Sequence, residues 1–354
     1  MAQALEYRVR DAVKRLPPGY FALVMASGII SAGLYLEHHE TLSLVLLVVC
    51  VAAFVVLVVL NGWRLIRYFH AVYEDFSNPH VSFGFFTFVA ATNVIGMRLS
   101  LDGYYQWTGW LLLVASIGWL LLGYLVPWTT VLGSGARPAM ASADGTWFVW
   151  VVASQSVAIA AATLEPITST ARSGLAIFAV LAWSLGCFLY AAEGVFVLLR
   201  EMMYDFKAED LTPSYWVAMG AASITVLAGA RIVQMATAPM VEVMHGLIAG
   251  LSVMFWALAA WLIPLLTAAM WWRHGTHRVP IRYESDLWSV IFPLGMFAVA
   301  SIYLGDADNL PLIGDIGEVE LWVAFGAWVL TFVAMLAHLA RGIFAAPKLE
   351  PGRS

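Results

Sequence analysis

The sequence predicts an all-α integral membrane protein with ten transmembrane helices arranged as five repeated hairpins. Of its 354 residues, 62% are hydrophobic and 12% are charged, and the mean hydropathy is +0.82. A soluble domain carries roughly 25% charged residues, so this chain could not cover a water-facing surface. Ten long apolar stretches follow one another, and an aromatic signature precedes every second stretch. These observations together predict the fold class and its repeat.

The ten apolar stretches are long enough to be membrane helices, because a bilayer core takes about 20 helical residues. They cover residues 18–36, 41–62, 82–101, 106–132, 146–164, 173–199, 213–235, 244–272, 285–304 and 319–344. We expect one transmembrane domain over residues 18–344, a cytoplasmic N-terminal segment over 1–17 and a cytoplasmic tail over 345–354. No small-residue cleavage pattern closes the first stretch, which predicts a retained helix rather than a signal peptide.

The positive charges predict the orientation of these helices. Among the 18 lysine and arginine residues, only Arg98, Arg172 and Arg231 fall on one side of the predicted membrane. Cytoplasmic segments carry an excess of lysine and arginine. We therefore expect a multi-pass protein of the plasma (inner) membrane with both termini in the cytoplasm.

An aromatic signature begins each odd-numbered stretch, as PGYF, FGFF, GTWF, PSYW and SDLW. The last aromatic residues of the five signatures, called the anchors below, are Phe21, Phe86, Phe148, Trp216 and Trp288. Each interval between anchors holds one pair of helices, so all five pairs enter the membrane in the same sense. Parallel repeats of this kind are related by an axis along the membrane normal. Five of them predict a closed ring.

Small and polar residues recur at fixed distances from the anchors and predict a central pore. Polar side chains within a membrane normally face the bundle interior or a water-filled cavity, which places odd helices inside and even helices outside. A close-packed bundle without a pore would also favour small residues, and this alternative stays open. Seven residues after the anchors stand Gly28, Asn93, Gln155, Ser223 and Gly295. Four residues after them stand Met25, Ala90, Val152, Gly220 and Phe292.

Phe292 is the only aromatic residue of its layer, and it is followed directly by Pro293. A proline inside a helix removes a backbone hydrogen bond and kinks the helix. One interpretation is that this kink lays the Phe292 ring across the pore as a gate. The other is an ordinary kink, tolerated in membrane helices, beside a packed or lipid-facing phenylalanine.

Charged residues within the apolar stretches provide the remaining candidate sites. Arg231 and Arg98 would attract anions to the outer mouth, or would simply extend toward the interface. Glu193 fits a structural contact between helices or subunits, and alternatively proton coupling. Glu242 and His245 would serve an intramembrane enzyme, although no catalytic set can be placed at one depth.

Several classes of cofactor and partner lack support in the sequence. Cys50 and Cys187 lie in apolar stretches without metal-ligand spacing, so we expect neither a metal nor another cofactor. There is no basic patch with interleaved aromatic residues, so nucleic-acid binding is not expected.

Three segments carry a resemblance to a known family. PPGYFALVMASGIIS, TWFVWVVASQSVA and LWSVIFPLGMFAVAS resemble the tellurite-resistance/C4-dicarboxylate transporter family, which includes bacterial tellurite-resistance proteins, fungal malate and sulfite transporters and plant slow anion channels. The resemblance covers residues 16–345. It implies a trimer in which each subunit has ten helices around a central pore. It also implies that a phenylalanine of the ninth helix occludes that pore. The matching residue here is Phe292.

The expected function is therefore an anion channel or transporter rather than an enzyme. The predicted pore lacks paired arginines that could clamp two carboxylates, which favours small monovalent anions such as chloride or nitrate. The alternatives are proton-coupled transport of C4-dicarboxylates, sulfite or tellurite, and an intramembrane enzyme.

Overall fold

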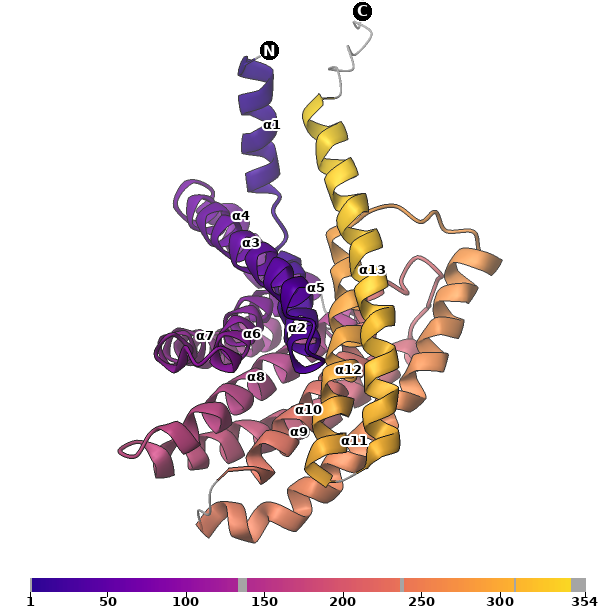
Figure 1. Cartoon of the computed structure of the whole chain (residues 1–354). Helices are drawn as coiled ribbons and strands as arrows, with labels where there is room; N and C mark the ends of the chain where they lie inside the picture. The colour runs from indigo at the N-terminus through magenta and orange to yellow at the C-terminus, as the bar shows by residue number, and fades with distance from the viewer. Residues whose placement is uncertain (1, 133–138, 236–238, 309, 345–354) are drawn as a thin grey trace, which may run out of the picture.

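Helices joined by short connecting segments make up the residues that the structure, a computed structural model, describes: 2–132, 139–235, 239–308 and 310–344 (Figure 1). Ten helical segments within these ranges are long and apolar enough to cross a membrane. This confirms the predicted class of an all-α integral membrane protein.

Five inner helices and five outer helices alternate along the chain. The inner helices are α2 (Ala22–Leu36), α6 (Phe86–Leu101), α8 (Val149–Leu164), α10 (Val217–Val233) and α12 (Trp288–Asp308). The outer helices are α3 (Glu40–Arg67), α7 (Tyr105–Leu132), α9 (Arg172–Met203), α11 (Pro239–Trp271) and α13 (Pro311–Phe344). Three shorter helices are α1 (Ala2–Lys14), α4 (Phe69–Ser77) and α5 (Pro79–Ser82).

Burial separates the two sets of long helices. In the most apolar stretch of each inner helix, between 78% and 94% of the residues are buried, against 17% to 33% in the outer helices. The outer helices present large apolar side chains such as Trp261, Leu330 and Phe188. Such a surface suits lipid, because apolar side chains there lose nothing by contact with acyl chains.

The inner helices contact one another in a closed ring. Helix α2 packs against α6, α6 against α8, α8 against α10 and α10 against α12, and α12 returns to α2. Each inner helix also packs against the outer helix that follows it in the chain. The ring therefore forms a buried centre, and the outer helices surround it.

Each inner helix is preceded by a short 3-10 turn that contains or adjoins its aromatic anchor. The five turns are Pro18–Phe21, Phe83–Phe85, Gly145–Phe148, Pro213–Trp216 and Ser285–Leu287. All five anchor side chains are buried, with at most 6% of their surface exposed. Burial of a large aromatic ring supplies much of the energy that positions a helix, so the same chemistry starts all five inner helices.

Four outer helices donate a tryptophan hydrogen bond to the inner helix of the next repeat. The bonds join Trp119 Nε1 to Ser154 Oγ (2.9 Å), Trp183 Nε1 to the Thr225 carbonyl (3.1 Å), Trp256 Nε1 to Ser301 Oγ (2.8 Å) and Trp328 Nε1 to Ser27 Oγ (2.9 Å). In the first repeat Phe54 of α3 stacks on Phe88 of α6, with centroids 6.0 Å apart. Neighbouring repeats are thus tied to one another at buried positions.

The helices extend beyond the predicted spans where polar residues interrupt the apolar pattern. Helix α13 begins at Pro311 rather than residue 319, and α11 begins at Pro239 rather than residue 244. Asp315 and Glu318 lie in the added part of α13. Charged residues lower the hydropathy of a segment, so a membrane span predicted from hydropathy ends before them, although the helix itself continues. For the same reason the pattern did not indicate α1 or α4.

The ends of α1 and α13 extend from the same edge of the bundle in Figure 1.

Candidate functional site

The layer that contains Phe292 is closed to water in this structure. Met25, Ala90, Val152 and Phe292 each have at most 2% of their surface exposed, and Gly220 is also buried. Phe292 and Met25 are among the largest fully buried side chains of the protein. The five residues come from the five inner helices. Each inner helix therefore contributes one buried residue to this layer, and none of the five residues is accessible to water.

Pro293 directs its ring toward the neighbouring inner helix α10. A Cβ atom built on Gly220 would lie 2.9 Å from Pro293 Cγ and 3.3 Å from its Cα. Such a separation is shorter than van der Waals contact allows, so only glycine fits at residue 220. The absence of a side chain on α10 therefore makes room for the proline that follows Phe292.

Two glycines of the predicted pore layer lie at contacts between helices. A Cβ on Gly295 would lie 2.7 Å from Ile30 Cγ1 of α2, and a Cβ on Gly28 would lie 2.6 Å from Val94 Cγ1 of α6. The same Gly28 position adjoins Cys50 Sγ of α3 at 3.1 Å. Both glycines thus allow close approach of adjacent helices.

The three polar residues of that layer donate hydrogen bonds, two of them to a neighbouring helix and one to the preceding turn of its own helix. Asn93 Nδ2 donates to Ser156 Oγ of α8 at 3.0 Å, and Gln155 Nε2 donates to the Trp183 carbonyl of α9 at 3.2 Å. Ser223 Oγ donates to the Met219 carbonyl of its own helix at 2.8 Å. Asn93 Oδ1 and Gln155 Oε1 are buried without a hydrogen-bond partner among the described residues. Among the described side chains of this layer, these two oxygens are the buried polar atoms without a partner.

Arg98 is enclosed in a hydrogen-bond network that joins three helices. It is 2% exposed, and its Nε donates to Ser31 Oγ of α2 and to Ser43 Oγ of α3, at 3.0 and 3.1 Å. Its Nη1 pairs with Asp102 at 2.8 Å, and its guanidinium lies 4.4 Å from the centroid of the Tyr35 ring. The structure thus places this arginine at a contact of α2, α3 and α6.

Arg231 has different surroundings, on α10 near the same end of the ring. Its guanidinium carbon lies 4.8 Å from the centroid of the Tyr303 ring on α12. Its Nε is buried without a hydrogen-bond partner, and it makes no ion pair within the described part of the chain. A cation held over an aromatic face without an ion-paired carboxylate among the described residues keeps part of its positive field available to an anion. The sequence analysis did not indicate Tyr303, which lies on the same helix as the Trp288 anchor, toward its other end.

A sequence model of the voltage-dependent anion channel family matches residues 15–336. The chain belongs to the voltage-dependent anion channel family. The match covers all ten membrane helices almost to the end of α13, and it confirms the family resemblance seen in the sequence.

The sequence is also similar to proteins described as uncharacterized membrane proteins or transporters. An uncharacterized membrane protein of Mycobacterium tuberculosis is 59% identical over 156 residues, which is 44% of this chain and 79% of the relative. Two uncharacterized transporters of Methanocaldococcus jannaschii are 22% and 20% identical, over 94% of this chain and 96% and 98% of their own lengths. Similarity across the full chain thus extends to transporters of an archaeon.

The residues that would serve an enzyme do not form an enclosed site in this family member. Glu242 and His245 are both exposed on α11. Within the described ranges no three histidine, cysteine or acidic residues gather in a metal-binding group. The five inner helices therefore hold the better candidate site.

Proposed function

We propose that the protein moves small anions along the axis enclosed by the five inner helices, and that Phe292 closes this path. The observation that carries the proposal is the buried layer of Met25, Ala90, Val152, Gly220 and Phe292, contributed by all members of a closed ring. Membership in the voltage-dependent anion channel family supports anions as the transported species. An ion cannot cross a dry apolar constriction without losing water, so such a layer acts as a gate.

The gate depends on the shape of α12 around Phe292. Pro293 kinks the helix, and Gly220 on α10 receives the proline ring. In this proposal the two residues together hold the Phe292 side chain in the layer, so movement of α12 against α10 opens the path. Either a channel or a carrier could use such a movement.

Arg231 is proposed to draw anions toward the outer end of the path. Its guanidinium has no carboxylate partner among the described residues, whereas Arg98 is committed to Asp102 and two serines. The Arg231 charge would raise the local concentration of anions. A single unpaired arginine suits a monovalent anion such as chloride or nitrate; sulfite, tellurite and C4-dicarboxylates, carried with protons, are the alternatives for a selectivity measurement.

The membrane setting belongs to the same proposal. We expect a homotrimer in the plasma membrane with both termini in the cytoplasm, because of the charge distribution and the resemblance described above. A reporter fused after Ser354 should then report a cytoplasmic location, and one inserted near Asp308 an external location. Chemical cross-linking in membranes should give a trimer.

The deciding experiment compares anion flux into liposomes for wild type, Phe292→Ala and Phe297→Ala. Phe297 is a matched control because it lies on the same helix, is equally buried, and stacks on Trp256 of α11 at 5.9 Å. We expect Phe292→Ala to raise basal flux of chloride or nitrate and Phe297→Ala to leave it near wild type, at equal amounts of folded protein. A folded Phe292→Ala protein that is no leakier than wild type would place the gate elsewhere.

A further inference from the structure

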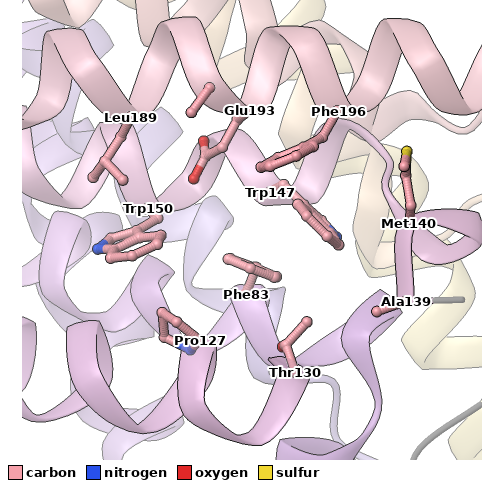
Figure 2. Close-up of a pocket in the computed structure, with 11 residues that line it drawn as sticks. Phe83, Pro127, Thr130, Ala139, Met140, Trp147, Trp150, Leu189, Glu193 and Phe196 are labelled. Carbon is pink, nitrogen blue, oxygen red and sulfur yellow. The ribbon is translucent and has the colours of Figure 1, made fainter. Parts of the chain in front are cut away.

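A cavity of about 270 Å³ lies outside the centre of the inner ring, between α8 and the outer helices α7 and α9 (Figure 2). It is almost entirely apolar, and its walls include Phe83, Trp147, Trp150 and Phe196. Ligand pockets commonly span roughly 300–1,000 Å³, so this cavity suits a small organic molecule. Phe196 is 43% exposed, which places the opening of the cavity at the surface of the outer helices.

The aromatic rings of this cavity pack on one another. Phe83 stacks on Trp147 with centroids 4.8 Å apart, and Trp147 meets the edge of Phe196 at 6.1 Å. Trp150 stacks in turn on Phe86 at 5.7 Å. Contacts among the rings hold this wall in one arrangement, which limits the reorganisation that binding of a ligand would need.

One carboxylate points into this aromatic enclosure. Glu193 projects from α9 toward the space between Trp150, Trp147 and Phe83 (Figure 2), and it is only 3% exposed. Neither of its oxygens has a hydrogen-bond partner among the described residues. Arg200, two turns further along α9, pairs with Asp210 at 3.6 Å instead. A buried ionised carboxylate is stable only when a cation or several donors accompany it.

We infer that this cavity binds an alkylammonium group, with Glu193 as its counter-ion and the aromatic rings as its walls. A cation with apolar substituents gains from ring faces and loses little hydration on entry. It would also pair with the carboxylate, which otherwise lies buried without a partner. Thr130 Oγ1 and Trp147 Nε1, on the same walls, lack partners in the described part of the chain as well and could bond to a hydroxyl or ether group of the ligand.

The ammonium group could come from a free amine or from a lipid headgroup, because the cavity reaches the surface that faces the bilayer. Both sources present the same chemistry to Glu193. The cavity lies outside the proposed anion path, so ligand binding there does not depend on the gate.

Binding of choline can test the site when it is compared with dimethylbutanol, the neutral carbon analogue of choline. Calorimetric titrations would use protein in phosphatidylglycerol nanodiscs, where no lipid carries an ammonium group. The variants are Glu193→Gln, which keeps the shape of the side chain, and Glu201→Gln, a control carboxylate on α9 outside the cavity lining. Gel filtration and melting profiles would confirm that each variant is folded.

We expect choline to bind wild type and Glu201→Gln equally, and Glu193→Gln about tenfold more weakly or worse, because the variant loses a charge-assisted contact. Dimethylbutanol should bind all three proteins alike. Equal choline affinity for wild type and Glu193→Gln would overturn the inference, as would no choline binding to folded wild type. Phosphatidylcholine nanodiscs then identify the source: weaker choline binding there assigns the site to the lipid headgroup, and unchanged binding assigns it to free amines.

Discussion

Pro293 of α12 occupies the space that a side chain would fill on Gly220 of α10, with its Cγ 2.9 Å from the Cβ that residue 220 lacks. A proline inside a helix cannot donate the backbone hydrogen bond to the residue four positions earlier, here Ser289, and it typically kinks the helix. Gly220 leaves room for the proline ring beside α10. We expect these two residues on different helices to set the position of Phe292 together.

Replacement of Gly220 by alanine should disturb this contact. The new methyl group would collide with the proline ring, which cannot rotate away, so we expect a loss of about 1–3 kcal/mol in stability together with a higher basal anion flux. Gly246→Ala is the matched control, because a Cβ there meets nothing within 4 Å and should stabilise α11 by up to about 1 kcal/mol. Thermal unfolding in detergent and liposome flux measure both effects. Equal behaviour of the two variants would contradict the role of the contact.

Replacement of Arg231 by alanine should lower anion flux at low ionic strength. The difference from wild type should shrink in concentrated salt, because exposed charges are screened over roughly 8–10 Å at 0.1–0.15 M. Arg231→Lys should retain most of the flux, since it keeps the charge. Arg172→Ala is a suitable control, because that arginine pairs with Glu165 at 2.7 Å. Conductance at two salt concentrations would show the effect, and an unchanged value at low salt would rule out electrostatic attraction by Arg231.

Arg98→Met should act mainly on stability. The change removes the cation from Asp102 and leaves the hydroxyl groups of Ser31 and Ser43 with fewer partners, and breaking a buried charge pair typically costs about 3–5 kcal/mol. The exposed Arg67→Met should change stability by less than about 0.5 kcal/mol. Denaturation midpoints in detergent compare the two variants. A midpoint for Arg98→Met equal to that of Arg67→Met would show that the network contributes nothing.

The raised pKa of Glu37, at the end of α2, predicts how the stability of the protein depends on pH. Burial raises the pKa of this carboxyl above its ordinary value of 4.5, and repulsion from Glu318 and Asp306 adds to the effect, against the attraction of His38 and His39. The folded state therefore binds the proton more tightly than the unfolded chain does. Folding is favoured as the pH falls through the raised pKa of Glu37 toward 4.5.

The corresponding variant is Glu37→Gln, which removes the titrating group. At neutral pH the variant should melt at a higher temperature than wild type, because the burial and repulsion of the negative charge are gone. The gain should disappear as the pH falls and wild-type Glu37 becomes protonated. A gain that is constant from neutral to acidic pH would show that some other property of the substitution is responsible.

The repeat could be predicted from the sequence because its signals are local. An anchor such as Phe148 and the small residues that follow it lie on one helix, so their spacing alone indicates a recurring element. The partner of each small residue could not be predicted in this way. Gly28 faces Val94 of the next inner helix, and Gln155 reaches the carbonyl of Trp183 on an outer helix. A glycine or glutamine beside a pore and one between two helices have the same local sequence, so only the packing distinguishes them.

The same limit applies to the charged residues. Arg98 and Arg231 occupy similar depths in the sequence pattern, yet only Arg98 lies among hydroxyl groups contributed by Ser31 and Ser43. Those serines precede Arg98 by more than 50 residues, and no periodicity relates them to it. The aromatic enclosure around Glu193 likewise combines helices from two repeats, which hydropathy alone does not bring together.

The hydrogen bond from Trp328 to Ser27 spans 301 positions of the chain, and it has a consequence for biosynthesis. Segments emerge from the ribosome N-terminal first, so α2 enters the bilayer long before α13 has been made. Until then the nascent protein is an open arc, with one flank of α2 facing lipid or an insertion chaperone instead of α12 and α13. A message truncated before the last hairpin would leave that arc permanently open, and quality-control proteases could recognise the unpaired polar flank.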